Sequence, residues 1–251
     1  MLVLLSPAKT LDYKRPLPEL VPTEPRFADE AMTLATEAAK LTERDLSRIM
    51  SISASLAQLN VERYRGFAGL PERPALFAFA GDVYTGFEAR TLDEAAIDFA
   101  QDHVRILSGL YGLLRPLDAI RPYRLEMGTR WAPQSGDLYA HWGTRISDLL
   151  ARDMAAQDSN VIVNLASKEY WGAVERHPPA DADIYTIEFM EEGPAGPRFN
   201  SFAAKRARGM MARYISEHRL TEVEALQGFD TDGYAFDRAA SDERRWRFTR
   251  R

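Results

Sequence analysis

Hydrophobic and polar positions follow two different periods along this chain, and the changes of period predict where its strands and helices lie. The apolar run 1–5 ends at Ser6-Pro7 and predicts a buried strand. Segments 103–107 and 160–165 predict two more buried strands, and 183–190 alternates as a half-buried strand does. Strands alternate with helices, and hairpin-like segments stand at both ends of the predicted sheet. We therefore predict a mixed α/β (α+β) fold, with a mixed sheet surrounded by helices.

Helical spacing is clearest in the first third of the chain. Apolar residues recur every three or four positions from Ala31 to Leu41, and Thr42 with Asp45 is typical of a capping box that begins a second helix. Helices are expected to continue to about Phe67. The remaining helices are predicted at 94–100 behind a Thr91 cap, at 146–154, at the basic segment 203–219, and in a short helix behind a box of Thr221 and Glu224.

Three other segments carry weaker patterns. The apolar run 74–80 predicts a strand, and 199–202 predicts another. Trp246 and Phe248 alternate with arginines, which is typical of an edge strand with its charges toward solvent. The prolines of segment 11–25 favour an extended surface arm.

Composition narrows the class of protein. The chain has 251 residues, of which 45% are hydrophobic and 27% charged, and no repeat or flexible linker divides it, so we expect one domain over 1–251. The lack of cysteine excludes disulfides and thiolate metal sites. The four histidines have no metal-binding spacing, so no metal or cofactor is expected. No segment has the ~20 consecutive apolar residues of a membrane helix or the pattern of a signal peptide, which favours a cytoplasmic location without a membrane partner.

Positive charge is concentrated in two segments, although the formal net charge is −5. Residues 103–130 and 200–220 are rich in arginine and lysine and poor in carboxylates. If the two segments converge, their arginines would suit the phosphates of a nucleic acid, while Tyr123 and Trp142 would suit base stacking. Equally, the cations could pair with some of the 37 acidic residues, and both aromatic residues could belong to the core.

Polar residues follow several predicted strands. Ser6 to Thr10 could hold a phosphate on backbone N–H groups and Lys9, although the P-loop spacing is missing. Asp82 could act as a general base or a metal ligand, but an aspartate in a Gly-Asp turn usually accepts backbone hydrogen bonds. Asn164 to Ser167 stand at the carboxyl end of a strand, where open α/β sheets bind ligands, or they could simply cap a helix.

The segment 107–112 is similar to the glycine turn of a helix-hairpin-helix DNA module. Two residues separate Gly109 from Gly112 where that module has one, and Pro116 would interrupt the second helix. No Gly-x-Ser-x-Gly elbow is present, so no catalytic residue can be assigned.

Four of these motifs occur together as a set, at 4–12, 81–86, 107–128 and 164–167. As a set they resemble the YaaA family of peroxide stress proteins, along nearly the whole chain. The resemblance implies a cytosolic protein that limits hydrogen peroxide damage and is associated with lower free iron. It also implies a compact α/β fold with a basic cleft, a helix-hairpin-helix-like element and DNA binding. Direct iron binding would need clustered histidines and carboxylates, so an indirect effect on iron is the better expectation.

Two main hypotheses follow. In the first, the protein binds the DNA backbone without sequence preference. In the second, the same cleft belongs to an enzyme that acts on a nucleotide, a nucleobase-like molecule or another small phosphate. A scaffold for a partner protein is a third alternative. The predicted phosphate contacts are Lys9, Arg115, Arg121, Arg124, Lys205 and Arg208. The predicted cleft-lining residues are Ser6, Thr10, Asp82, Tyr84, Ser108, Gly109, Tyr111, Gly112, Tyr123, Glu126, Asn164 and Ser167.

Overall fold

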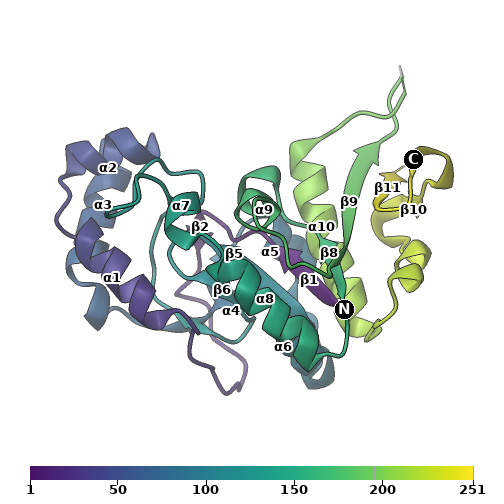
Figure 1. The fold of residues 1–251 in the computed structure, drawn as a ribbon, viewed down its shortest axis with the longest axis horizontal. Coiled ribbons are helices and arrows are strands. Elements are labelled where there is room, and N and C mark those ends of the chain that lie inside the picture. Colours follow the sequence, from purple (N-terminus) through teal and green to yellow (C-terminus); the bar gives the residue numbers. More distant parts are fainter. Residues whose placement is uncertain (195, 251) are drawn as a thin grey trace.

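A seven-stranded sheet organises the computed structural model, which describes residues 1–194 and 196–250 (Figure 1). Its strand order is β10-β11-β9-β8-β1-β5-β6. The strands are β1 (Leu2–Leu5), β5 (Val104–Ser108), β6 (Gly112–Leu114), β8 (Val161–Asn164), β9 (Asp183–Glu191), β10 (Tyr234–Phe236) and β11 (Arg245–Arg250).

The sheet is mixed, as predicted. Strands β11, β9, β8, β1 and β5 run parallel, while β6 and β10 pair antiparallel at the two edges. Every residue of β1 is buried, which agrees with its uninterrupted apolar sequence. The predicted edge position of 245–250 is wrong, because β11 lies between β9 and β10. Its Arg247 instead forms an ion pair with Glu188 of β9 at 3.2 Å.

Two groups of helices cover the sheet. One group comprises α5 (Asp82–Phe87), α6 (Glu94–His103) and α10 (Ser201–Glu217), and the other comprises α7 (Leu138–Trp142), α8 (Arg145–Ala156) and α9 (Lys168–Glu175). The chain passes from β1 to β5 through α6, and in the opposite direction from β8 to β9 through α9. Because such parallel connections are right-handed, the two groups lie on opposite faces.

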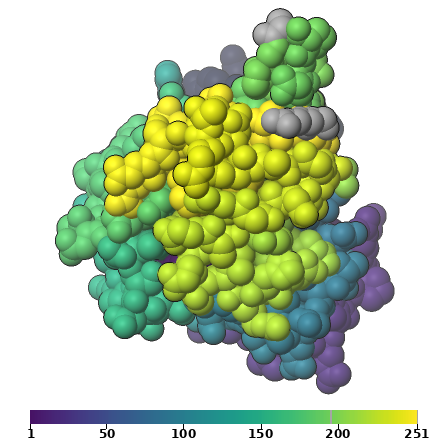
Figure 2. All heavy atoms as spheres, turned by 90° about the vertical axis from the view of Figure 1, so that its right-hand side faces the viewer, coloured from purple at the N-terminus to yellow at the C-terminus, as the bar shows by residue number. Residues whose placement is uncertain are grey.

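The first helices stand to one side of the sheet, at the end opposite β10 and β11 (Figure 1). They are α1 (Ala28–Ala38), α2 (Glu43–Met50) and α3 (Ala54–Arg65), followed by a short 3-10 turn at Phe67–Gly69. The capping box predicted at Thr42 and Asp45 is confirmed at the start of α2. The C-terminal third, light green to yellow in Figure 2, spreads over the other end of the molecule.

Several local predictions are wrong, each for a reason of context. Segment 74–80 is not one strand. It forms the short helix α4 (Ala75–Ala78) between the two-residue strands β3 (Arg73–Pro74) and β4 (Phe79–Ala80). A run of apolar residues has no alternation that distinguishes a strand from a helix, which is why the prediction failed. β3 pairs with β7 (Ala119–Ile120), and β4 pairs with β2 (Thr10–Leu11). Segment 199–202 is not a strand, since Asn200 caps α10. The cap of α6 is Asp93 rather than Thr91.

The glycine turn at 107–112 is a β-hairpin rather than a helix-hairpin-helix. Ser108 closes β5 opposite Gly112 of β6, and Gly112 has a positive φ of 65°. A side chain at Gly112 would meet the Trp142 ring at 2.7 Å. Glycine is therefore needed here for the turn and for close packing, which accounts for the pattern that the sequence shows.

Candidate functional site

Polar residues gather where three parallel strands of the sheet end. Ser6 follows β1, Ser108 ends β5 and Asn164 ends β8. The chain leaves β1 toward β5 on one side and leaves β8 toward β9 on the other, so the boundary between β1 and β8 is a topological switch point. Open α/β sheets bind ligands at the carboxyl ends of strands at such points.

Hydrogen bonds join the two segments that follow β1 and β8. The backbone N–H of Ser167 donates to Ser6 Oγ at 2.8 Å, and the two hydroxyl oxygens are 3.3 Å apart. Asn164 Oδ1 accepts from the backbone N–H of Ala166 at 3.0 Å. These bonds fix the approach to α9, which has no side-chain cap of its own.

Buried tyrosines surround this edge of the sheet. The Tyr84 hydroxyl donates to the carbonyl of Ser6 at 3.1 Å, and the hydroxyls of Tyr123 and Ser108 are 2.7 Å apart. Burial raises the pKa of Tyr84, Tyr123 and Tyr170 above that of an exposed tyrosine. Their hydroxyls therefore stay protonated at neutral pH and act as hydrogen-bond groups rather than bases.

Glu126 joins two of the predicted phosphate-binding cations. Its Oε1 lies 3.3 Å from Lys9 Nζ and 3.0 Å from a guanidinium nitrogen of Arg124. Glu126 Oε2 is buried and has no hydrogen-bond partner within residues 1–194 and 196–250. Lys9 remains 63% exposed, so it is accessible to a ligand from outside this cluster.

Arg115 and Arg121 also face carboxylates. Arg115 lies 2.9 Å from Asp118, whose carboxyl group is fully buried, and Arg121 lies 2.8 Å from Glu72. The structure thus holds four of the six predicted phosphate contacts in ion pairs. A phosphate would have to displace those carboxylates or share the cations with them.

Lys205 and Arg208 of α10 are different. Neither forms an ion pair within the described part of the chain. Lys205 is exposed and lies 5.8 Å from the centre of the Phe202 ring. Arg208 is half-buried, burial lowers its pKa, and its Nε has no partner among the described residues. Both cations are therefore available to an anion.

The other predicted cleft residues divide into exposed and packed groups. Thr10 is exposed in β2, and Asp82 begins α5 rather than standing in a free turn. Tyr111, Gly109 and Gly112 are buried in the hairpin between β5 and β6. The Tyr111 hydroxyl accepts from the backbone N–H of Arg121 at 3.0 Å. Trp142 is also buried and donates to the Gly109 carbonyl at 3.0 Å, so that ring packs in the core.

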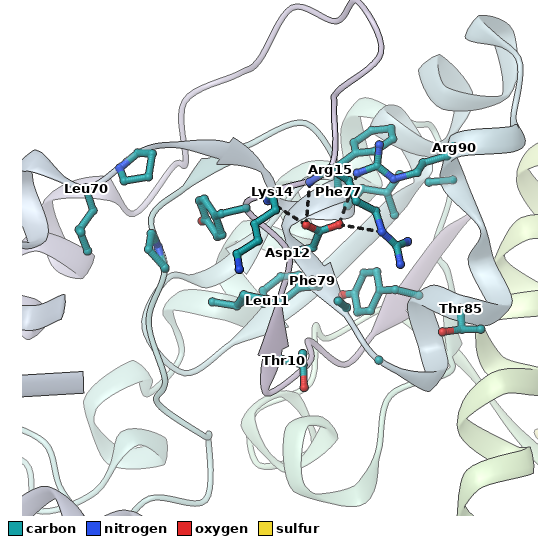
Figure 3. A pocket seen from close by; sticks show the side chains of 18 of the residues that line it. Thr10, Leu11, Asp12, Lys14, Arg15, Leu70, Phe77, Phe79, Thr85 and Arg90 are labelled. Carbon is teal, nitrogen blue, oxygen red and sulfur yellow. Dashed lines mark hydrogen bonds and ion pairs between the residues drawn. The ribbon is translucent and has the colours of Figure 1, made fainter. Parts of the chain in front are cut away.

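Sequence reasoning missed a pocket beside this edge, with a volume of about 1010 Å³ (Figure 3). Of the predicted site residues only Thr10 and Tyr84 line it. Its wall combines residues of 10–15, the second half of α3, and 70–90. Some of them belong to the motifs at 4–12 and 81–86, but the others are apolar or ordinary surface charges, so no pattern indicated that these segments enclose a pocket.

Among residues 1–194 and 196–250, no three histidine or acidic side chains are placed to hold a metal ion. Within the same residues, no helix has the length and apolar character needed to cross a bilayer.

Comparison with known proteins agrees with the resemblance of the motifs. Residues 1–240 match the family described as "Peroxide stress protein YaaA". A UPF0246 protein of Rhizorhabdus wittichii is 63% identical over 251 residues, covering 100% of this chain and 99% of that protein. UPF0246 proteins of Jannaschia sp. and Polynucleobacter asymbioticus are 52% and 49% identical, covering 94% and 96% of this chain and 91% and 95% of their own lengths. The chain therefore belongs to the YaaA family of peroxide stress proteins.

Proposed function

We propose that this peroxide stress protein acts in the cytoplasm and protects DNA by binding its phosphate backbone. The observation that carries the proposal is the pair of consecutive helices α2 and α3, which are joined by the short turn of Ser51, Ile52 and Ser53. We propose that this pair, rather than 107–112, serves as the helix-hairpin-helix-like element that the family resemblance implies. Serines replace the usual glycines, which is why the sequence pattern did not reveal it.

Three features of the turn between α2 and α3 support its use as an anion-binding turn. Ser51 has a left-handed φ of 51°, and Ile52 is 8% exposed and anchors the turn. The Ser47 hydroxyl donates to the Ile52 carbonyl at 2.8 Å. Ser51 and Ser53 are exposed, and the first backbone N–H groups of the twelve-residue helix α3 follow them. The Ser53 hydroxyl already accepts from the Leu56 N–H at 3.4 Å, so a phosphate at this position would meet the remaining N–H donors of the first turn and the positive end of the helix dipole.

Cations on two elements would extend this contact. Arg44 is exposed on α2 and has no ion pair among the described residues, and Lys205 and Arg208 supply charge on α10. The other four predicted contacts would bind phosphate only by giving up their ion pairs with carboxylates; they are Lys9, Arg115, Arg121 and Arg124. We propose that any lowering of free iron is indirect, because the histidines are scattered along the chain.

Duplex affinity measured against salt concentration tests this proposal. We expect log K to fall linearly with log [salt], as it does when phosphate contacts release counterions. Ser51→Asp should weaken binding because it adds a like charge to the hairpin, and Arg44→Ala should reduce the salt slope by about one. The matched control is Ala156→Asp, which adds the same charge at the exposed end of α8. A flat salt plot, or equal affinities for the two aspartate variants, contradicts the proposal.

The switch point favours a second candidate, an enzyme or receptor for a nucleotide-like molecule. Ser6, Asn164 and Ser167 lie at the sheet edge where such ligands bind. Calorimetric titration with adenosine monophosphate and with inorganic phosphate tests it. Saturable binding that Ser167→Ala weakens would support this candidate, and no heat from either ligand would exclude it for these probes.

A further inference from the structure

The pocket of Figure 3 is not used by either proposed function and has the construction of a small-molecule site. It lies between the arm that carries β2, the second half of α3 and the segment from β4 to the 3-10 turn at Ala89–Thr91. Its volume of about 1010 Å³ is at the upper end of ordinary ligand pockets. Leu11, Leu59, Leu70, Phe77 and Phe79 contribute to an apolar wall.

The Asp12 carboxylate in the pocket is already paired with groups of the protein. The Asp12 carboxylate accepts from the backbone N–H groups of Lys14 and Arg15 at 2.9 and 3.1 Å. It also lies 3.5 Å from the Arg15 guanidinium and 3.7 Å from that of Arg90, as the dashed lines in Figure 3 show. These bonds lower the pKa of Asp12, so its charge is held by groups of the protein itself.

Two cations of the pocket, Arg63 and Lys14, are not paired with a carboxylate of the described residues. Arg63 is half-buried on α3, and its side chain forms no hydrogen bond or ion pair within residues 1–194 and 196–250. Burial lowers its pKa, so the charged guanidinium lacks both full hydration and a carboxylate partner. Lys14 is exposed at the same pocket and has no ion pair with any described residue.

The remaining acids restrict the ligand. Glu88 lines the pocket and lies 3.7 Å from Arg213, which does not line it. The Glu62 carboxylate accepts a hydrogen bond from the Gln58 side chain at 3.4 Å. Both carboxylates would repel a doubly charged phosphate monoester more than a singly charged group. A guanidinium binds a carboxylate through two parallel hydrogen bonds. The wall of leucine and phenylalanine side chains suits an apolar body.

We propose that this pocket binds an amphipathic monocarboxylate. Its carboxylate pairs with Arg63, with Lys14 near the opening, and its hydrocarbon part lies against Leu59 and Phe79. The pocket shares Tyr84 with the sheet edge, where the Tyr84 hydroxyl is bonded to Ser6. An occupant of the pocket would therefore contact a residue that holds the end of β1.

Calorimetry with 4-phenylbutyrate, and with the neutral 4-phenylbutan-1-ol, tests the proposal on the whole protein. We expect saturable one-to-one binding of the carboxylate and weaker binding of the alcohol. Arg63→Gln should lower the carboxylate affinity by on the order of tenfold, the usual effect of losing a hydrogen bond to a charged group. The matched control, Arg65→Gln, changes an exposed arginine of the same helix and should keep the affinity.

A second variant guards against misfolding of the first. Thr85 is exposed and lines the pocket (Figure 3), so Thr85→Trp should fill the space and abolish binding without removing a charge. Absence of saturable binding, equal affinities of the Arg63 and Arg65 variants, or full binding by Thr85→Trp would each overturn the proposal. None of these results bears on duplex binding by α2 and α3.

Discussion

The Ser6 hydroxyl accepts a hydrogen bond from the backbone N–H of Ser167 at 2.8 Å, although 161 positions separate the two residues. This bond joins the segment after β1 to the segment after β8 at the switch point of the sheet. Ser6 is 8% exposed, so water can replace the hydroxyl only poorly.

Ser6→Ala should therefore destabilise the protein. Removing the hydroxyl leaves the Ser167 N–H without its acceptor, and we expect the free energy of unfolding to fall by about 1–3 kcal/mol. Urea denaturation measures the change. Ser55→Ala is the control, because Ser55 is exposed and bonds only to the Ser53 hydroxyl among the side-chain hydrogen bonds of the described residues. Equal stability of the two variants would show that the buried bond contributes little.

Helices α5 and α10 should not tolerate a larger residue at Gly209. A Cβ there would lie 1.8 Å from the Val83 carbonyl oxygen and 2.7 Å from the Phe87 nitrogen, both of which are backbone atoms that cannot rotate away. Gly209→Ala is expected to lower the free energy of unfolding by about 3 kcal/mol or more. Gly69→Ala serves as the control, since no described atom beyond its chain neighbours and its own helical turn lies within 4 Å of a Cβ at that position. Thermal unfolding of both variants measures the difference. Similar melting temperatures for the two variants would refute the close packing of α5 against α10.

Asp118 should be required for the stability of the loop that follows β6. Its fully buried carboxylate accepts from the Arg115 backbone N–H at 2.8 Å and from the Thr23 hydroxyl at 2.7 Å, and it pairs with the Arg115 side chain. Asp118→Asn should cost about 2–3 kcal/mol, because it removes the charge and leaves polar groups unmatched.

The comparison for Asp118 is the exposed pair of Lys40 and Glu37. Glu37→Gln should change the free energy of unfolding by less than about 1 kcal/mol, as is usual for surface ion pairs. Chemical denaturation of both variants gives the difference. A loss for Glu37→Gln as large as that for Asp118→Asn would contradict the assignment of Asp118 as the stabilising partner.

His103 should make stability depend on pH below neutrality. It is 8% exposed, stacks on Phe99 at 4.0 Å and has Nδ1 2.8 Å from the Met1 carbonyl. Burial lowers its pKa, although the hydrogen bond to Met1 opposes that effect. As the pH falls, the histidine of the unfolded chain takes up its proton before that of the folded protein does. The contribution of neutral His103 to the free energy of unfolding is therefore complete above a pH of about 6.5 and is lost as the pH falls through the lower pKa of the folded protein.

Stability measured between neutral and mildly acidic pH checks this expectation. His103→Gln should make the free energy of unfolding fall less steeply below the pKa of an unfolded histidine, whatever the substitution does to stability at neutral pH. His218→Gln, at an exposed position, should leave the decline unchanged. Some decline should remain in the His103 variant, because burial also lowers the pKa of His141. Identical slopes for both variants would exclude His103 as the source.

Much of the local structure could be predicted from the sequence. The strands β1, β5, β8 and β9, the capping box of α2 and the basic helix α10 were predicted correctly, because each depends on the spacing or type of neighbouring residues. The predictions for 74–80 and 107–112 were wrong. An apolar run and a pair of glycines are compatible with several structures, and packing against Trp142 selected the hairpin at Gly112.

The candidate site was predicted only in part. The sequence placed Ser6, Asn164 and Ser167 at strand ends, and parallel strands bring such ends to one edge. It did not show that Arg121 faces Glu72 or that Lys9 and Arg124 share Glu126. That the Arg63 guanidinium has no partner among the described residues also became visible only in the structure, because its surroundings come from segments far apart in the chain.

The sequence alone therefore determined the periodic elements, the acidic composition and the family, since these depend on the order and identity of residues. The tertiary structure decided which charges are neutralised, which glycines permit contact between helices and where a pocket opens. Those properties depend on distances of a few ångströms between side chains from remote segments. Electrostatic and packing energies change steeply over such distances, so no local pattern can specify them.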